Sequence, residues 1–160
     1  MAAILCLISL WQIPIGLFGV GMTFQTFAIA LAGYTLGVKK GGAAVLVYMV
    51  LGAVGVPVFS GFQGGLGVLL GPTGGFILFF LPMVLFCSLG KGKKAFPSLL
   101  WGALGLKSCH FLGTAGYALW ADCDYLSASL SVSVPYLFKD IFLVICAFFV
   151  SKALCKNLKI

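Results

Sequence analysis

The chain has 160 residues, of which 62% are hydrophobic and only 8% are charged, and its formal net charge is +7. A soluble domain carries about 25% charged residues, so this composition excludes an ordinary water-soluble protein and predicts an integral membrane protein. The positive charge comes from lysines that lie mostly between apolar segments, which indicates membrane topology and gives no reason to expect a nucleic-acid partner. The length suits a single transmembrane domain over residues 1–160.

Six helical segments are expected in chain order. The first, over residues 2–11, is apolar but shorter than the roughly 20 residues that span a bilayer. A connection rich in glycine and proline follows at residues 12–21. The later helices are expected over residues 23–36, 42–54, 72–89, 96–119 and 135–155. The fold class predicted is therefore an all-α integral membrane protein with six transmembrane helices.

The lysines are unevenly distributed over this arrangement. Eight of them fall between the second and third helices, between the fourth and fifth, or at the C-terminal end: Lys39, Lys40, Lys91, Lys93, Lys94, Lys152, Lys156 and Lys159. All eight lie on one side of a six-helix bundle, and the connections 12–21, 57–71 and 121–134 lie on the other. Because positively charged connections stay in the cytoplasm, we expect both termini to be cytoplasmic.

Residues 52–75 hold nine of the 22 glycines. Irregular backbone at membrane depth is tolerated only where protein buries it or where it lines a cavity. One interpretation is a loop-lined cavity for a small ligand. The other is close helix packing through small residues.

Asp140 is the carboxylate expected within a helix, five residues after Pro135 and near the outer end of the last helix. An ionisable residue in such a place is costly and marks a functional site by default. The alternative is an ion pair with Lys139. Adjacent helical positions point about 100° apart, which disfavours that pairing.

Other polar and aromatic residues allow two interpretations each. Lys107 can hold a ligand carboxylate or extend to the membrane interface. Thr23 and Gln25 can line the cavity or bond to the preceding connection. Tyr117, near the end of the fifth helix, can anchor the interface or stack on a ligand. His110 is expected to be a hydrogen-bonded packing residue rather than a metal ligand.

The sequence contains none of the catalytic motifs considered. The chain has no HExxH, GxSxG or Walker A sequence, and its loop aspartates, Asp122 and Asp124, lie far from Asp140 in the chain. No cofactor and no metal is expected. A small membrane protein with an outer cavity and few polar groups fits a binding or transport subunit.

Several runs resemble one known family. They are TFQTFA at residues 23–28, LAG at 31–33, GVPVFSG at 55–61, GGLG at 64–67, GPTGGF at 71–76, and Pro135-Tyr136 with Asp140. Together they resemble the biotin-specific substrate-capture subunit, or S component, of energy-coupling factor transporters, the BioY family. The resemblance implies an S-component-like bundle in a bacterial plasma membrane, with an outward-facing biotin pocket closed by the first, third and fifth connections. It also implies docking on a transmembrane coupling protein and a pair of ATPase subunits. The alternatives are an S component for another vitamin and a structural membrane subunit.

The resemblance also implies roles for individual residues. An ionised Asp140 can accept hydrogen bonds from the urea N–H groups of biotin, and Gln25, Gln63, Thr23 or the backbone N–H groups around Gly64 and Gly65 can serve the urea carbonyl. The apolar walls are expected from Phe59, Phe62, Leu66, Val68 and Tyr117. The family's lysine three residues after the aspartate is replaced by Leu143. We therefore expect Lys107 to supply the cation and Lys107→Met to weaken binding more than Lys139→Met.

Overall fold

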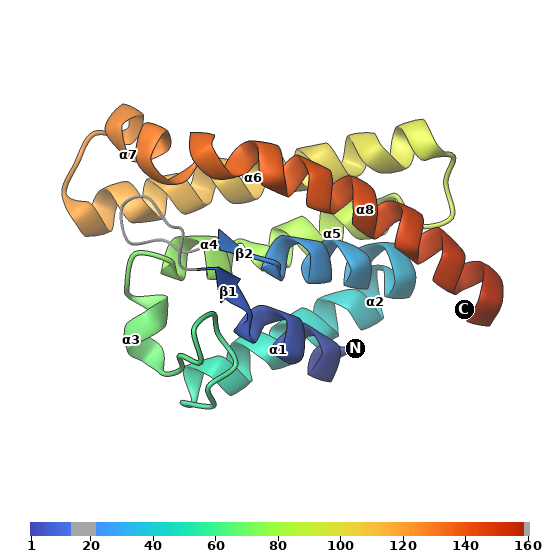
Figure 1. The fold of residues 1–160 in the computed structure, drawn as a ribbon, viewed down its shortest axis with the longest axis horizontal. Helices are drawn as coiled ribbons and strands as arrows, with labels where there is room; N and C mark the ends of the chain where they lie inside the picture. The colour runs from blue at the N-terminus through green and yellow to red at the C-terminus, as the bar shows by residue number, and fades with distance from the viewer. Residues whose placement is uncertain (14–21, 159–160) are drawn as a thin grey trace.

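The structure is a computed structural model that describes residues 1–13 and 22–158, and most of these residues are helical (Figure 1). The helices are α1 (Ala2–Leu10), α2 (Gln25–Ala53), α3 (Leu66–Leu69), α4 (Gly74–Leu78), α5 (Phe80–Leu89), α6 (Ala95–Ala121), α7 (Tyr125–Val132) and α8 (Val134–Leu158). Two short antiparallel strands, β1 (Gln12–Ile13) and β2 (Met22–Thr23), pair Gln12 with Thr23. Most of the connection expected over residues 12–21 lies outside the described residues, as does Lys159.

Helix α2 is broken sharply at Gly37. Its φ of 78° and ψ of −175° form a backbone conformation that only glycine adopts readily. The chain reverses there, and the arms 25–36 and 38–53 pack together so closely that a Cβ on Gly41 would lie 3.1 Å from the carbonyl oxygen of Ala32. The predicted division into two helices at Gly37 is confirmed, although the second arm begins before residue 42.

The single helix predicted over residues 72–89 is partly confirmed: an apolar helical segment runs over Gly74–Leu89, but it is interrupted at Phe79 between α4 and α5. Pro82 provides the physical reason. A proline inside a helix has no N–H for the carbonyl four residues earlier, and its ring collides with that carbonyl. Leu78 is four residues before Pro82, and α4 ends there. The glycine-rich segment before it also contains a single helical turn, α3.

The connection predicted over residues 121–134 is also partly wrong. Helix α6 ends where Asp122 adopts a left-handed conformation, with φ of 49°. Helix α7 then forms in the serine-rich stretch and packs on α6 and α8. Ala128 and Val132 are its buried residues, and their spacing of four places them on one helical face. This pair is the sequence signal for α7.

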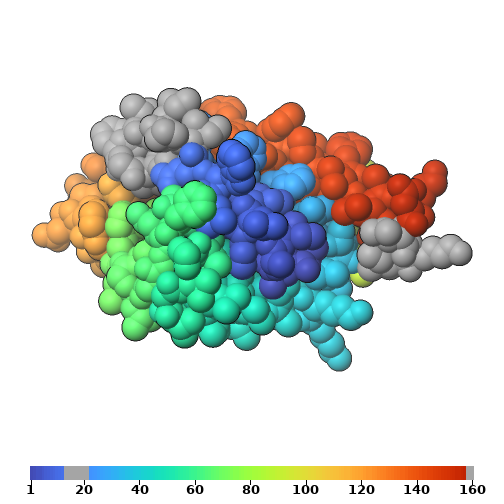
Figure 2. Space-filling model, turned by 60° about the horizontal axis from the view of Figure 1, so that its bottom comes forward, coloured from blue at the N-terminus to red at the C-terminus, as the bar shows by residue number. Residues whose placement is uncertain are grey.

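The long helices pack lengthwise around α2. Its two arms lie against α5 and α8, while α5 and α8 both contact α6 (Figure 1). Tyr48, Ile29 and Met83 are among the large side chains buried completely in this core. Helix α1 lies on the outside of the bundle, beside the glycine-rich segment (Figure 2), and buries Leu5 and Ser9 against α2.

The two ends of the bundle carry different features. The connection between α5 and α6 and the last turns of α8 lie at one end, and α3 and α7 lie at the other (Figure 1). The break in α2 belongs to the first end, since a Cβ on Gly37 would lie 3.3 Å from Cδ of Lys91. The lysine-rich connections thus meet at one end of the fold.

Candidate functional site

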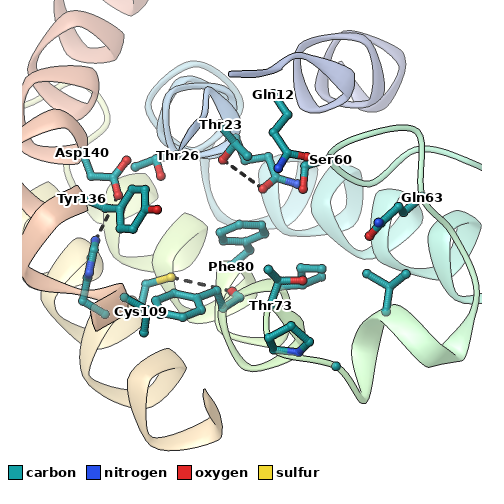
Figure 3. A pocket seen from close by; sticks show the side chains of 18 of the residues that line it. Gln12, Thr23, Thr26, Ser60, Gln63, Thr73, Phe80, Cys109, Tyr136 and Asp140 are labelled. Atoms are coloured by element: carbon teal, nitrogen blue, oxygen red, sulfur yellow. Dashed lines mark hydrogen bonds and ion pairs between the residues drawn. The ribbon is translucent and has the colours of Figure 1, made fainter. Parts of the chain in front are cut away.

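A pocket of about 390 Å³ opens between α2, α4, α6 and α8, next to β2 and the glycine-rich segment. Ligand pockets in proteins commonly measure about 300–1,000 Å³. Figure 3 shows Asp140, Tyr136 and Thr26 on one side of this pocket and Ser60 and Gln63 on the opposite side. Phe80 lies between the two polar groups. The pocket is thus polar at both ends and apolar between them.

Asp140 of α8 forms the charged centre of one end. The residue is only 6% exposed. Its Oδ2 lies 3.1 Å from Nε2 of His110, and its Oδ1 lies 2.7 Å from Nζ of Lys139. The Oδ1 atom has no hydrogen bond of good geometry, although the ion pair is close. This oxygen therefore keeps capacity to accept a hydrogen bond from a ligand.

His110 of α6 connects Asp140 to the start of α8. Its Nδ1 lies 2.9 Å from the hydroxyl of Ser133, the residue between α7 and α8. Because an ionised carboxylate only accepts hydrogen bonds, Nε2 carries the proton that points to Asp140. In a neutral imidazole, Nδ1 then accepts from the Ser133 hydroxyl. The ring is held at both nitrogens, which agrees with the prediction that His110 is a hydrogen-bonded residue.

Lys139 contacts Asp140 directly, contrary to the sequence interpretation. Its Nζ also donates a 2.8 Å hydrogen bond to the backbone carbonyl of Thr23 in β2. The lysine side chain is long enough to overcome the angle between adjacent helical positions. Lys139 therefore both balances the carboxylate and joins α8 to β2.

Thr23 and Gln25 form a second hydrogen-bonded chain at the pocket wall. The Thr23 hydroxyl donates to the amide oxygen of Gln25, at 3.2 Å, and the amide nitrogen of Gln25 donates to the Tyr48 hydroxyl, at 2.8 Å. Tyr48 is completely buried. The amide of Gln25 is thereby fixed in one orientation, with a second N–H still available.

The opposite end of the pocket is built from the glycine-rich segment. The backbone N–H of Phe59 donates to the carbonyl of Gln63, at 2.9 Å, and closes a turn between them. Ser60 and Gln63 from this turn line the pocket, together with Gln12 of β1. The apolar wall consists mainly of Val68, Phe76, Ile77, Phe80, Leu106 and Val132.

The structure brings together five of the predicted residues: Asp140, Gln63, Gln25, Thr23 and Val68 all line the pocket. Gly64 and Gly65 do not line it. Gly64 instead passes so close to the backbone that an added Cβ would lie 2.5 Å from the carbonyl oxygen of Val56, and Gly65 has a φ of 97°. Both glycines shape the segment, which holds Gln63 in place.

The aromatic wall expected from Phe59, Phe62 and Tyr117 is not formed by those residues. Phe59 is fully buried under Tyr48, with ring centroids 5.5 Å apart, while Phe62 is 70% exposed. Tyr117 packs on Trp120, with ring centroids 6.0 Å apart. Leu66 is also exposed. Within the turn at residues 59–63, Phe59 points into the core and Phe62 points outwards.

The expected position of Lys107 in the cavity needs the same correction. Its side chain is exposed, and it does not line the pocket. Positions 106, 109 and 110 of α6 face the pocket, and residue 107 lies on another face of that helix. Lys139, not Lys107, supplies the cation beside Asp140.

Several pocket residues were not predicted from the sequence. Thr26, Ser60 and Tyr136 are polar residues of the lining, and Lys139, which the sequence offered only as a disfavoured ion-pair partner of Asp140, lines the pocket too. Tyr136 precedes Asp140 by four residues, so the two share a helical face, and that spacing was the available signal. Nothing comparable in the sequence indicates that Ser60 would turn inwards.

Comparisons with known proteins agree with one another. A family model described as the BioY family matches residues 1–160. The probable biotin transporter BioY of Pyrococcus horikoshii is 44% identical over 93 residues, which are 58% of this chain and 57% of that protein. The biotin transporter BioY of Thermotoga maritima is 35% identical over 156 residues, which are 95% of this chain and 90% of that protein. A crystal structure of the S-component for biotin from an ECF-type ABC transporter superimposes with a TM-score of 0.89 at 25% identity, covering 97% of this chain and 86% of that one.

Proposed function

Because the chain belongs to the BioY family, we propose that it is the biotin-binding substrate-capture subunit of an energy-coupling factor transporter. The observation that carries this proposal is the pocket itself. It has a buried carboxylate at one end, amide and hydroxyl groups at the other, and aromatic and aliphatic side chains between. Biotin has a matching order of groups: a cyclic urea, an apolar ring and chain, and a carboxylate.

Asp140 is the residue we assign to the urea. Its Oδ1 accepts a charge-assisted hydrogen bond from a urea N–H, which is stronger than one between neutral groups. Tyr136 and Thr26 lie beside it (Figure 3) and can serve the urea carbonyl through their hydroxyl groups. Lys139 and His110 hold the carboxylate in position through their contacts with its two oxygens.

The carboxylate of biotin is assigned to the far end, where Gln12, Ser60 and Gln63 line the pocket. These groups are neutral, so they offer hydrogen bonds without a fixed charge. Gln25 and Thr23 also line the pocket wall. Because their side chains are polar, they suit the urea of biotin better than its apolar ring and chain. Phe76 and Phe80 supply flat surfaces for the ring and chain.

A membrane location follows from the family and from the surface. Large hydrophobic side chains are exposed on every long helix, for example Leu46, Leu85, Leu104 and Phe142. Large apolar side chains exposed on all of the long helices suit a surface that faces lipid. Among the described residues, Gln25–Ala53 is long and apolar enough to cross a membrane by length and composition, but the break at Gly37 divides it into two arms; Gly74–Leu89 is a shorter apolar segment. We propose six membrane-spanning segments, counting the two arms of α2 separately and α4 with α5 as one.

The lysine-rich end is assigned to the cytoplasm and the pocket to the outside. This orientation obeys the positive-inside rule and lets biotin enter from the medium. A transmembrane coupling protein and a pair of ATPase subunits are the proposed partners, and they would supply the energy that this chain does not generate. We assign no catalytic reaction to the chain.

Thiol labelling tests the orientation. Cys123 is exposed between α6 and α7, and Cys155 lies in the final part of α8. In intact cells, a membrane-impermeant maleimide should label the wild-type chain and the Cys155→Ser variant equally, whereas Cys123→Ser should lose most of the label. Loss of labelling in Cys155→Ser instead would reverse the orientation.

Retention of ligand tests the function. The protein purified in detergent from cells grown with biotin should carry one biotin per chain in native mass spectrometry. Riboflavin and thiamine added in excess should leave that complex intact. Displacement of biotin by either vitamin, or absence of any biotin complex at saturating concentration, would contradict the proposed function.

A further inference from the structure

A second cavity, of about 410 Å³, lies at the lysine-rich end of the bundle, away from the pocket described above. It opens between the connection that follows α5, the start of α6 and the last turns of α8. Lys91, Lys93, Lys94 and Lys152 line it, together with Tyr34 and Ser151. Four lysines and two hydroxyl-bearing residues thus contribute to the lining of one concave surface.

These lysines have no carboxylate partner within the described residues. The three aspartates of the chain are Asp122, Asp124 and Asp140. The first two lie next to α7, at the far end of the bundle (Figure 1), and Asp140 is paired with Lys139 and His110. Like charges gathered in a hollow with low-dielectric walls produce a strong positive potential. A bound anion would relieve that repulsion.

Two of the lysines are held in place by aromatic rings. Nζ of Lys93 lies 5.4 Å from the centroid of the Trp101 ring, and Nζ of Lys152 lies 5.1 Å from that of Phe148. These cation–π contacts limit the freedom of side chains that are otherwise flexible. Helix α6 also begins directly after Lys94, so the positive end of a 27-residue helix points to the same region. Two of the four lysines are therefore held by ring contacts without any ligand.

Exposed apolar side chains adjoin the residues that line the cavity. Leu89 directly precedes Gly90 of the lining and is 43% exposed. Phe149 of α8 is 60% exposed, and its ring centroid is 5.5 Å from that of Phe148 in the lining. An anion bound here would have apolar surface close to it, which suits an amphipathic ligand.

We propose that this cavity binds the phosphate-bearing headgroup of an anionic membrane phospholipid, with the acyl chains lying along Leu89 and Phe149. Basic pockets between helices on the cytoplasmic side of a membrane suit such headgroups. This site is separate from the biotin pocket, although it rests on the membrane location given with the proposed function. A soluble phosphate compound shares the headgroup chemistry but would gain nothing from the apolar flank.

The test is a lipid titration of the purified full chain followed by native mass spectrometry. Phosphatidylglycerol and phosphatidylcholine with identical acyl chains are compared, with glycerol 3-phosphate as the soluble phosphate. We expect one phosphatidylglycerol to bind about tenfold more tightly than phosphatidylcholine. Glycerol 3-phosphate should bind far more weakly than phosphatidylglycerol. Equal affinity for the two lipids, or for glycerol 3-phosphate and phosphatidylglycerol, would overturn the proposal.

A matched pair of double variants locates the effect. Lys93→Gln with Lys152→Gln removes two cavity lysines, and Lys39→Gln with Lys40→Gln removes two exposed lysines that do not line the cavity. The first variant should bind phosphatidylglycerol about tenfold or more weakly, and the second should stay within about twofold of wild type. Equal losses in both variants would indicate diffuse surface charge and refute the site.

Biotin retention is measured in the same samples as a check on folding. If the Gln variant also loses biotin, Lys93→Arg with Lys152→Arg replaces it, and this charge-preserving variant should keep phosphatidylglycerol binding. Failure of the Arg variant to bind phosphatidylglycerol while it binds biotin would also refute the site. Loss of lipid selectivity with biotin binding intact contradicts this inference only, whereas absence of biotin binding in the wild-type chain contradicts the proposed function.

Discussion

Replacing Asp140 with asparagine should lower the affinity for biotin by about tenfold or more. The substitution preserves the shape but removes the charge and replaces one acceptor oxygen with a donor, which would then face a urea N–H. Removing one partner of a buried, charged hydrogen bond costs about 2–5 kcal/mol, and about 1.4 kcal/mol already corresponds to tenfold in affinity. Isothermal titration with biotin in detergent measures the effect.

Asp124→Asn is the matched control for this variant. Asp124 is exposed, stands at the N-terminal cap of α7 and does not line the pocket. Asparagine caps helices about as well as aspartate, so both folding and biotin affinity should stay at wild-type values. If Asp140→Asn folds and binds biotin with unchanged affinity, the carboxylate serves only the ion pair with Lys139, and its assignment to the urea is wrong.

Replacing Lys139 with methionine should weaken biotin binding and also lower the melting temperature. The change removes the ammonium group 2.7 Å from Oδ1 of Asp140 and the hydrogen bond to the Thr23 carbonyl. Breaking a buried ion pair by removing one partner costs about 3–5 kcal/mol. The Lys139 side chain keeps 21% exposure, so we expect a loss near the lower end of that range, shared between stability and affinity. Thermal unfolding and biotin titration measure the two parts.

Lys107→Met is the control, and it should leave both properties unchanged because Lys107 is exposed outside the pocket. This order reverses the ranking that the sequence alone suggested. Biotin methyl ester separates two roles for Lys139. Equal weakening of biotin and its ester indicates that Lys139 acts through Asp140, as the structure implies. A loss confined to biotin would instead place the ligand carboxylate at Lys139.

The composition and a few backbone-determining residues were enough to predict most of the fold. A chain with 8% charged residues and long apolar segments has few structures open to it other than packed membrane helices. Gly37 marked the division of α2 because glycine alone tolerates its backbone angles. The start and end of α6 followed from the lysines before it and the aspartates after it. The GPTGGF run pointed to the family, which the family model then matched over the whole chain.

Two elements were mispredicted although their signals were present. Pro82 determined the end of α4, but its effect falls four residues earlier in the chain, at Leu78. Helix α7 was hidden by serines that favour turns, and its burial against α6 and α8 outweighs that local preference. The break before Pro82 is a local effect, whereas for α7 the local sequence was ambiguous until packing selected the helix.

The partners of Asp140 were decided by tertiary structure alone. His110 and Asp140 are 30 positions apart on different helices, and their contact depends on how α6 and α8 pack. Lys107 was expected inside because Leu143 replaces the family's lysine, but residues 106, 109 and 110 of α6 face the pocket and residue 107 lies on another face of that helix. Helical periodicity predicts where the Cα atom of Lys139 lies, but it does not predict where the ammonium group lies. A four-carbon side chain bends across the gap between adjacent faces, and only the surrounding Thr23 carbonyl and Asp140 carboxylate determine where it ends.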